Sequence, residues 1–213
     1  TQPVDEPKVA VCPASTDLPV QDFAGKGWLI PALVDALGHV GVVEVNAEAG
    51  AQDGQTQRST NAAQVQVRDA LRLSMRSVQT ARKAGVGFVV VQPQGNLVIQ
   101  GQSVFVRTQD RADAVLQESA ALHVHVGDAA KRDEPLMTSR SGVHAVLRDH
   151  FARAKRLQEA LRQAPRDPAE RQWLASVRGD AALQVLVRAL EGELLVVVHA
   201  QRQEDIAAVL RLQ

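Results

Sequence analysis

Apolar residues recur in two different patterns along most of the chain. Short runs rich in Val, Ile and Leu predict buried strands, and apolar residues spaced three or four positions apart predict amphipathic helices. The predicted strands cover 32–35, 86–92, 103–107, 122–126 and 194–199. The predicted helices cover 67–83, 112–119, 143–163, 168–190 with a break near Gly179, and 204–212. Because strands that alternate with helices form parallel βα units, we expect an α/β fold with helices packed outside the sheet.

Two segments lack this alternation. Residues 1–30 carry short extended pieces separated by Pro and Gly, at 9–12, 18–23 and 28–30, which predict a small β-meander. Residues 46–66 are polar and without clear periodicity, and they predict a long surface loop, a kind of segment that is often functional or mobile.

The sequence argues against nucleic-acid binding, and against a segment that spans a membrane. The chain carries 24 Lys and Arg against 24 Asp and Glu, so its formal net charge is zero and it has no long-range attraction for phosphate backbones. Aromatic residues make up 3% and Tyr is absent, which leaves no stacking platform for nucleic-acid bases. No apolar run is long enough to span a bilayer. We therefore expect a soluble protein that binds no nucleic acid; the sequence, which begins at Thr1, leaves a cytoplasmic and an exported location open.

Histidines are the concentrated chemical feature of the sequence. His39 follows a predicted strand, His199 closes another, and His123 and His125 alternate along a third, so that these two point to one face. Sites in parallel α/β sheets form at the carboxyl ends of strands. These four imidazoles therefore predict a divalent-metal site or, alternatively, a set of hydrogen-bonded packing residues.

The remaining candidates carry less chemistry. His144 and His150 lie in a helix rich in Arg and Lys, which predicts solvated surface positions. The single cysteine, Cys12, forms neither an internal disulfide nor a zinc cluster. Asp35 lies within an apolar strand, which suggests a buried hydrogen-bonding role. The carboxylates that could approach the strand ends show no paired spacing typical of acid–base catalysis; they are Asp35, Glu44, Asp128 and Asp205.

Four segments, in their order and spacing, resemble a known family. Their sequences are GWLIPALVDALGH at 27–39, AGVGFVVV at 84–91, QGNLVIQGQ at 94–102 and VVVHAQRQEDI at 196–206. The corresponding motifs of the imidazolonepropionase-like amidohydrolases are VxPGLIDxHxH, AGVTTVxVxPG, GSANVIGGQ and VRIHAHRADDI. The resemblance covers nearly the whole chain from about Gly25 and implies a partial (β/α)8, TIM-like barrel. In that picture residues 1–30 belong to a small N-terminal β-sandwich, and residues 31–213 supply the first five barrel strands.

The resemblance also implies which residues would bind metal. His39 matches the second of two ligand histidines, and Leu37 occupies the place of the first. His199 matches the ligand histidine of the fifth strand, but Gln201 occupies the place of the next one. His123 falls where many relatives carry a lysine that can be carbamylated. The resemblance thus implies a vestigial or weak metal site at His39, His123 and His199, with no cofactor expected, or with zinc if the protein is active. The family's sixth-strand histidine and its eighth-strand aspartate, a metal ligand that serves as the base, have no counterpart in this sequence.

We therefore expect an amidohydrolase-like protein that has lost catalysis and acts as a structural or interaction subunit of a larger assembly. The alternative is a metal-dependent hydrolase of C–N bonds in cyclic amides or peptides, completed by another chain or by sequence not present here. A third possibility is a small-ligand binding module that uses the old pocket. Five strands of an eight-stranded barrel leave two open edges, so we expect another polypeptide, a second copy of the chain or further sequence to close the barrel.

Overall fold

The computed structural model describes residues 30–44, 53–54 and 59–211. The chain divides into two units, Thr1–Pro31 and Ala32–Gln213. The expected β-meander and β-sandwich strands of the first unit lie outside the described residues, as does much of the loop expected over 46–66.

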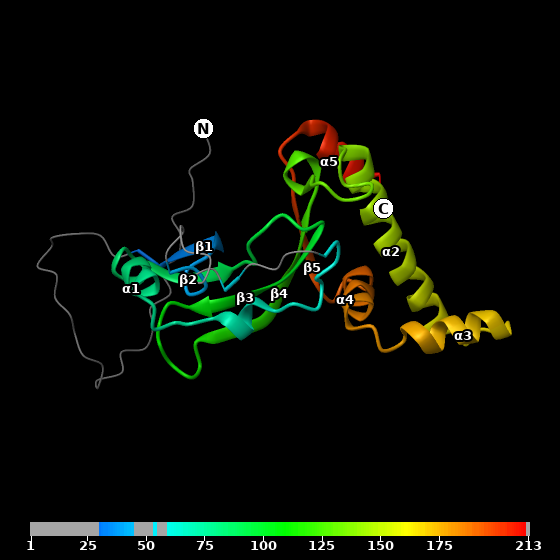
Figure 1. Cartoon of the computed structure of the whole chain (residues 1–213). Helices are drawn as coiled ribbons and strands as arrows, with labels where there is room; N and C mark the ends of the chain where they lie inside the picture. The colour runs from blue at the N-terminus through cyan, green and yellow to red at the C-terminus, as the bar shows by residue number, and fades with distance from the viewer. Residues whose placement is uncertain (1–29, 45–52, 55–58, 212–213) are drawn as a thin grey trace, which may run out of the picture. The chain divides into compact units, whose positions relative to one another are not determined.

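The second unit is built on one five-stranded sheet (Figure 1). Its strands, in spatial as well as chain order, are β1 (Leu33–Gly38), β2 (Val86–Val91), β3 (Ile99–Arg107), β4 (Val115–His125) and β5 (Leu195–His199). β1 runs parallel to β2, and β4 runs parallel to β5, whereas β3 is antiparallel to both of its neighbours. Four strands therefore point the same way and only β3 is reversed, so this curled sheet fits part of a barrel.

The helices of the described residues are α1 (Arg76–Lys83), α2 (Arg140–Arg162), α3 (Pro168–Val177), α4 (Ala181–Leu190) and α5 (Gln203–Leu210), with short 3-10 helices η2 (Val67–Ala70) and η3 (Gly127–Ala130). The four helices that come after β4 in the chain, α2 to α5, follow the predicted periodicity closely. The predicted break near Gly179 is confirmed, because Asp180 caps α4 by accepting hydrogen bonds from the backbone N–H groups of Ala182 and Leu183. No helix of the described residues has the length and apolar character needed to cross a membrane.

Three sequence-based expectations were wrong in detail. The short helix expected over 112–119 does not form: Val115 begins β4, which pairs with β3 as an antiparallel hairpin, Val106 opposite Val115. That hairpin also means that the sheet is mixed and not built of parallel βα units alone. The helix expected over 67–83 is interrupted between Ala70 and Arg76.

Two apolar cores cover the helix-bearing side of the sheet. The larger joins β4 to α2 and α4, and includes Leu122, Val124, Leu147, Leu157, Leu183 and Leu186. The smaller joins β2 and β3 to η2, and includes Val67, Val89, Val91, Val104 and Val106. Because side chains alternate along a strand, His123 and His125 project from the face of β4 opposite to Leu122 and Val124. The packing of the core thus decides which face of the sheet carries the histidines.

Candidate functional site

Polar side chains come together at one end of the sheet, where the parallel strands β1, β2, β4 and β5 have their carboxyl ends. His39 follows β1, Gln92 follows β2, and His125 and His199 are the last residues of β4 and β5. The parallel pairing of β4 with β5 places His125 directly opposite His199. The sequence-based expectation that these imidazoles share one strand-end region is therefore confirmed for His123, His125 and His199.

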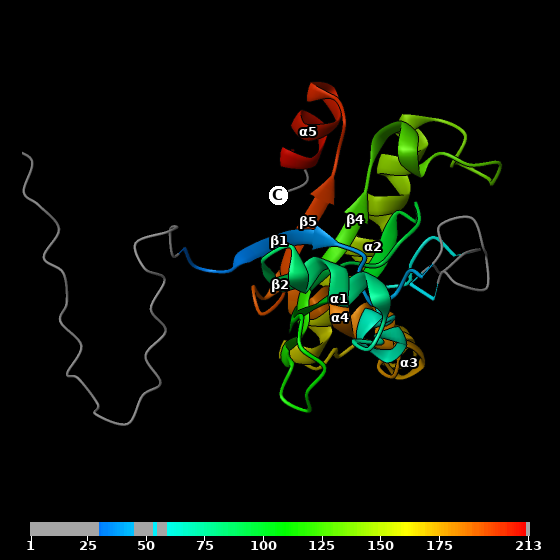
Figure 2. The ribbon, with the colours of Figure 1, turned by 90° about the vertical axis from the view of Figure 1, so that its left-hand side faces the viewer.

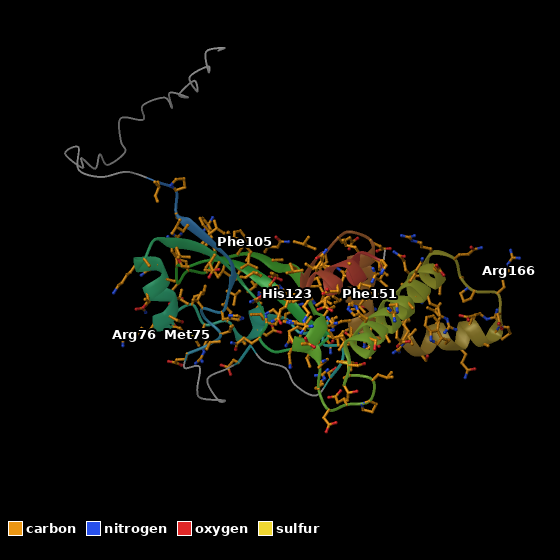
Figure 3. The ribbon with its side chains drawn as sticks, turned by 90° about the horizontal axis from the view of Figure 1, so that it is seen from above. Met75, Arg76, Phe105, His123, Phe151 and Arg166 are labelled. Atoms are coloured by element: carbon orange, nitrogen blue, oxygen red, sulfur yellow. The ribbon has the colours of Figure 1, made fainter. Side chains whose placement is uncertain are left out.

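The three imidazoles make close contacts with one another. His123 Nδ1 and His199 Nε2 are 2.9 Å apart, so one ring donates a hydrogen bond to the other. The ring of His125 stacks on that of His199, with centroids 4.3 Å apart and planes 8° from parallel. His123, which lies over the sheet, is fully buried (Figure 3). Two residues of β4 therefore fix the ring of His199: His123 shares a hydrogen bond with it, and His125 stacks on it.

Burial keeps these histidines neutral. Burial, with a smaller contribution from the neighbouring His199, lowers the pKa of His123 to about 3 and that of His125 to about 4. Burial also lowers the pKa of His199, with a smaller contribution from His39. The pKa of His39 is lowered by burial too, against an opposing contribution from Asp35. At neutral pH the cluster therefore carries uncharged imidazoles.

His39 is engaged in a contact that sequence analysis did not foresee. Its Nε2 lies 3.2 Å from Gln92 Nε2, so the amide donates a hydrogen bond to the unprotonated ring nitrogen. Gln92 comes directly after β2, and its position at a strand end was the signal that could have identified it. Leu37, one residue before the end of β1, is exposed and offers no donor or acceptor in its side chain.

The imidazoles gather without forming a ligand set for a catalytic metal. Such a metal needs about three protein ligands directed at one point, with each ligating nitrogen about 2 Å from the metal. In the described part of the chain, no three His, Cys, Asp or Glu side chains are arranged in this way. His123 and His199 bond to each other, and His39 bonds to Gln92. The donors in this arrangement do not fit a catalytic metal, and the metal assignment of His39, His123 and His199 stays a prediction.

Two histidines expected at the solvated surface are partly or wholly buried. His144 is 7% exposed, and its Nε2 lies 3.7 Å from Oδ1 of the buried Asp205, which is also 3.5 Å from Nη1 of Arg140. His150 Nε2 lies 3.0 Å from the hydroxyl oxygen of Thr60. The Arg- and Lys-rich sequence around both histidines concealed that each faces another element of the fold.

The other carboxylates are engaged locally. Asp35 accepts a hydrogen bond from the backbone N–H of Leu37 at 3.1 Å, which confirms a hydrogen-bonding role, although the contact is exposed and not buried. Asp128 pairs with Lys131 at 2.7 Å and with Arg202 at 2.8 Å. The hydrogen bond from Lys131 holds the pKa of Asp128 below its usual value. Neither carboxylate forms a pair with another that would suit acid–base catalysis.

Comparison with known proteins identifies a fold. No known protein-family model matches the chain, and no curated protein sequence matches it. Among solved structures it is similar to the crystal structure of an amidohydrolase from Thermotoga maritima MSB8, with 21% sequence identity and a TM-score of 0.73. The match covers 86% of this chain and 48% of that chain, so this chain spans about half the length of that protein. The likeness shows that the chain shares its fold with part of that amidohydrolase.

Proposed function

We propose that this chain is a catalytically silent, amidohydrolase-like half-barrel that serves as a structural or interaction subunit of a larger assembly. The observation that carries the proposal is the pairing of His123 with His199, in which each imidazole uses a nitrogen on the other instead of directing it to a common metal. Leu37 supports it further, because the resemblance to the imidazolonepropionase-like branch implies a ligand histidine at that position.

The second candidate is a metal-dependent hydrolase of C–N bonds in cyclic amides or peptides. One observation favours it: the lowered pKa values of His39, His123 and His199 keep these rings neutral, and the neutral imidazole is the form that binds metal. In this candidate the remaining ligands and the base come from another chain or from further sequence.

Metal content separates the two candidates. The protein, purified without chelator or histidine tag, is analysed for bound metals by mass spectrometry, with His199→Ala as the matched variant. The silent subunit predicts less than about 0.1 equivalent of metal in both proteins, because a site lacking three converged ligands binds weakly. Near-stoichiometric zinc, iron or manganese in the natural protein, lost in His199→Ala, would overturn the proposal in favour of the hydrolase.

A further inference from the structure

The helix that follows β5 is anchored by a buried charge. Asp205, in the first turn of α5, is 3% exposed and is the one buried residue of this helix. Burying a carboxylate is costly unless cationic groups compensate its charge. The carboxylate therefore needs a structural explanation, which the pairing of His123 with His199 does not supply.

Two side chains of α2 surround one oxygen of this carboxylate. Oδ1 of Asp205 lies 3.5 Å from Nη1 of Arg140 and 3.7 Å from Nε2 of His144, which is also buried. Both separations are at or beyond the limit of a direct hydrogen bond, so the attraction is one of charge more than of bonds with a fixed direction. Because the guanidinium of Arg140 is always protonated, α2 attracts Asp205 in either protonation state of His144.

The other oxygen of the carboxylate lies against the turn that follows β4. A Cβ on Gly127 would overlap Oδ2 of Asp205, so the absence of a side chain at this position makes room for the carboxylate. Gly127 also has a positive φ of 77°, a conformation that favours glycine. Figure 2 shows α5 continuing from the end of β5, next to this turn. Asp205 is thus enclosed between α2 and the turn after β4.

This enclosure lies next to the strand end that carries His199. The backbone N–H of Val126 donates a hydrogen bond to the carbonyl oxygen of His199 at 3.1 Å. Arg202 pairs with Asp128 at 2.8 Å, but both side chains are more than a third exposed, and ion pairs of this kind contribute little. Asp205 is therefore the buried connection between the segment after β5 and the rest of the fold.

We propose that Asp205 positions His199. By holding the first turn of α5 between α2 and Gly127, Asp205 keeps the end of β5 in place. There the ring of His199 bonds to His123 and stacks with His125. Asp205 acts through the backbone and is a positioning residue. The inference goes beyond the proposed function, because it concerns how the cluster is held and not whether the cluster binds metal.

Asp205→Asn tests the inference, because it keeps the shape of the side chain and removes its charge. Imidazole resonances in two-dimensional 1H–15N NMR spectra report the tautomer of His199. The natural protein should show one fixed tautomer, because Nε2 of His199 shares a hydrogen bond with His123. The variant should show averaged tautomers. Diethyl pyrocarbonate should also modify its His199 at least about fivefold faster, as followed by mass spectrometry, since local opening exposes the ring.

Two further variants separate this role from a general loss of charge. Asp128→Asn removes a carboxylate that is more than a third exposed, and it should leave the tautomer and the modification rate of His199 unchanged. Arg140→Gln weakens the attraction from the side of α2 without altering α5. It should raise the modification rate at least about threefold, and it tests the inference even if Asp205→Asn does not fold.

A pair of glycine variants tests the other side of the enclosure. Gly192 has a φ of 76°, close to that of Gly127, but nothing lies within 4 Å of a Cβ at that position. Alanine at either position strains the backbone to a similar extent, and only Gly127→Ala displaces the carboxylate. Faster modification of His199 is therefore expected in Gly127→Ala and not in Gly192→Ala.

The outcomes separate this inference from the proposed function. A folded Asp205→Asn protein with a single tautomer and the natural modification rate would overturn the positioning role. Equal release of His199 in Asp128→Asn would also overturn it, because the exposed ion pair would then hold the strand end. The metal content is a separate measurement. Bound metal would overturn the silent role alone, and an unchanged His199 in Asp205→Asn would overturn this inference alone.

Discussion

The buried imidazoles couple the stability of the protein to pH. In the unfolded chain a histidine has a pKa near 6.5, whereas in the folded protein the pKa of His123 is about 3 and that of His125 about 4. Below pH 6.5 the unfolded state therefore binds protons that the folded state does not. Stability should be full above pH 6.5 and should fall as the pH drops toward 4 and then 3, by up to about 1.4 kcal/mol per pH unit for each histidine.

Urea unfolding at pH 7.5 and at pH 5.5 measures this dependence. His123→Gln, which keeps a polar side chain of similar reach but cannot titrate, should show a smaller difference between the two pH values than the natural protein. Its stability at pH 7.5 serves as the reference for the substitution itself. A natural protein whose free energy of unfolding is unchanged between the two pH values would show that these imidazoles become protonated without cost in the folded state.

At the scale of single elements, the start of α2 depends on a glycine. Ser139 caps the helix by accepting a hydrogen bond from the N–H of Gly142 at 3.1 Å. A Cβ on Gly142 would overlap the backbone carbonyl of Leu136, which lies in the preceding turn and has a positive φ of 66°. Gly142→Ala should therefore destabilise the protein by at least about 2 kcal/mol, since backbone, unlike a flexible side chain, cannot easily move aside.

Gly179→Ala provides the matched comparison. Nothing lies within 4 Å of a Cβ at this position between α3 and α4, and its φ is not in the left-handed region. This variant should be neutral or stabilised by up to about 1 kcal/mol, because alanine reduces the conformational freedom of the unfolded chain. Thermal unfolding of both variants checks the pair. Equal losses of stability would show that the turn before α2 rearranges freely.

The helices and strands could be predicted from the sequence where the local pattern determines the secondary structure. They could not be predicted where pairing with a distant segment determines it. The periodicity of 143–163 located α2, and Gly179 located the break before α4. For 112–119 the same local pattern favoured a helix, but pairing of Val115 with Val106 across the hairpin selects a strand. Secondary structure there is determined by a partner strand that no local window contains.

The features of the candidate site likewise divide into those that could be predicted from the sequence and those that could not. Alternation along one strand was enough to place His123 and His125 on one face, and strand ends were enough to bring His199 to them. The bonding of His39 to Gln92 and the burial of His144 beside Asp205 depend on how strands and helices align in space. Spacing in the sequence carries no information on these contacts, so the distinction between a ligand and a packing histidine required the structure.

At the scale of the whole molecule, the balance of charges predicts how stability responds to salt. The chain carries 24 Lys and Arg against 24 Asp and Glu, so it has no overall repulsion for salt to relieve. Ion pairs such as Arg68–Glu118 and Arg156–Glu170 join side chains that are about half exposed, and each pair of this kind contributes at most about 1 kcal/mol. Salt weakens attraction between exposed charges, because the Debye length shrinks from about 10 Å at 0.1 M to about 3 Å at 1 M. The free energy of unfolding in urea should therefore change by less than about 1 kcal/mol between about 0.1 M and about 1 M sodium chloride. A loss of more than about 2 kcal/mol in 1 M salt would show that surface ion pairs, and not the apolar cores, hold the fold together.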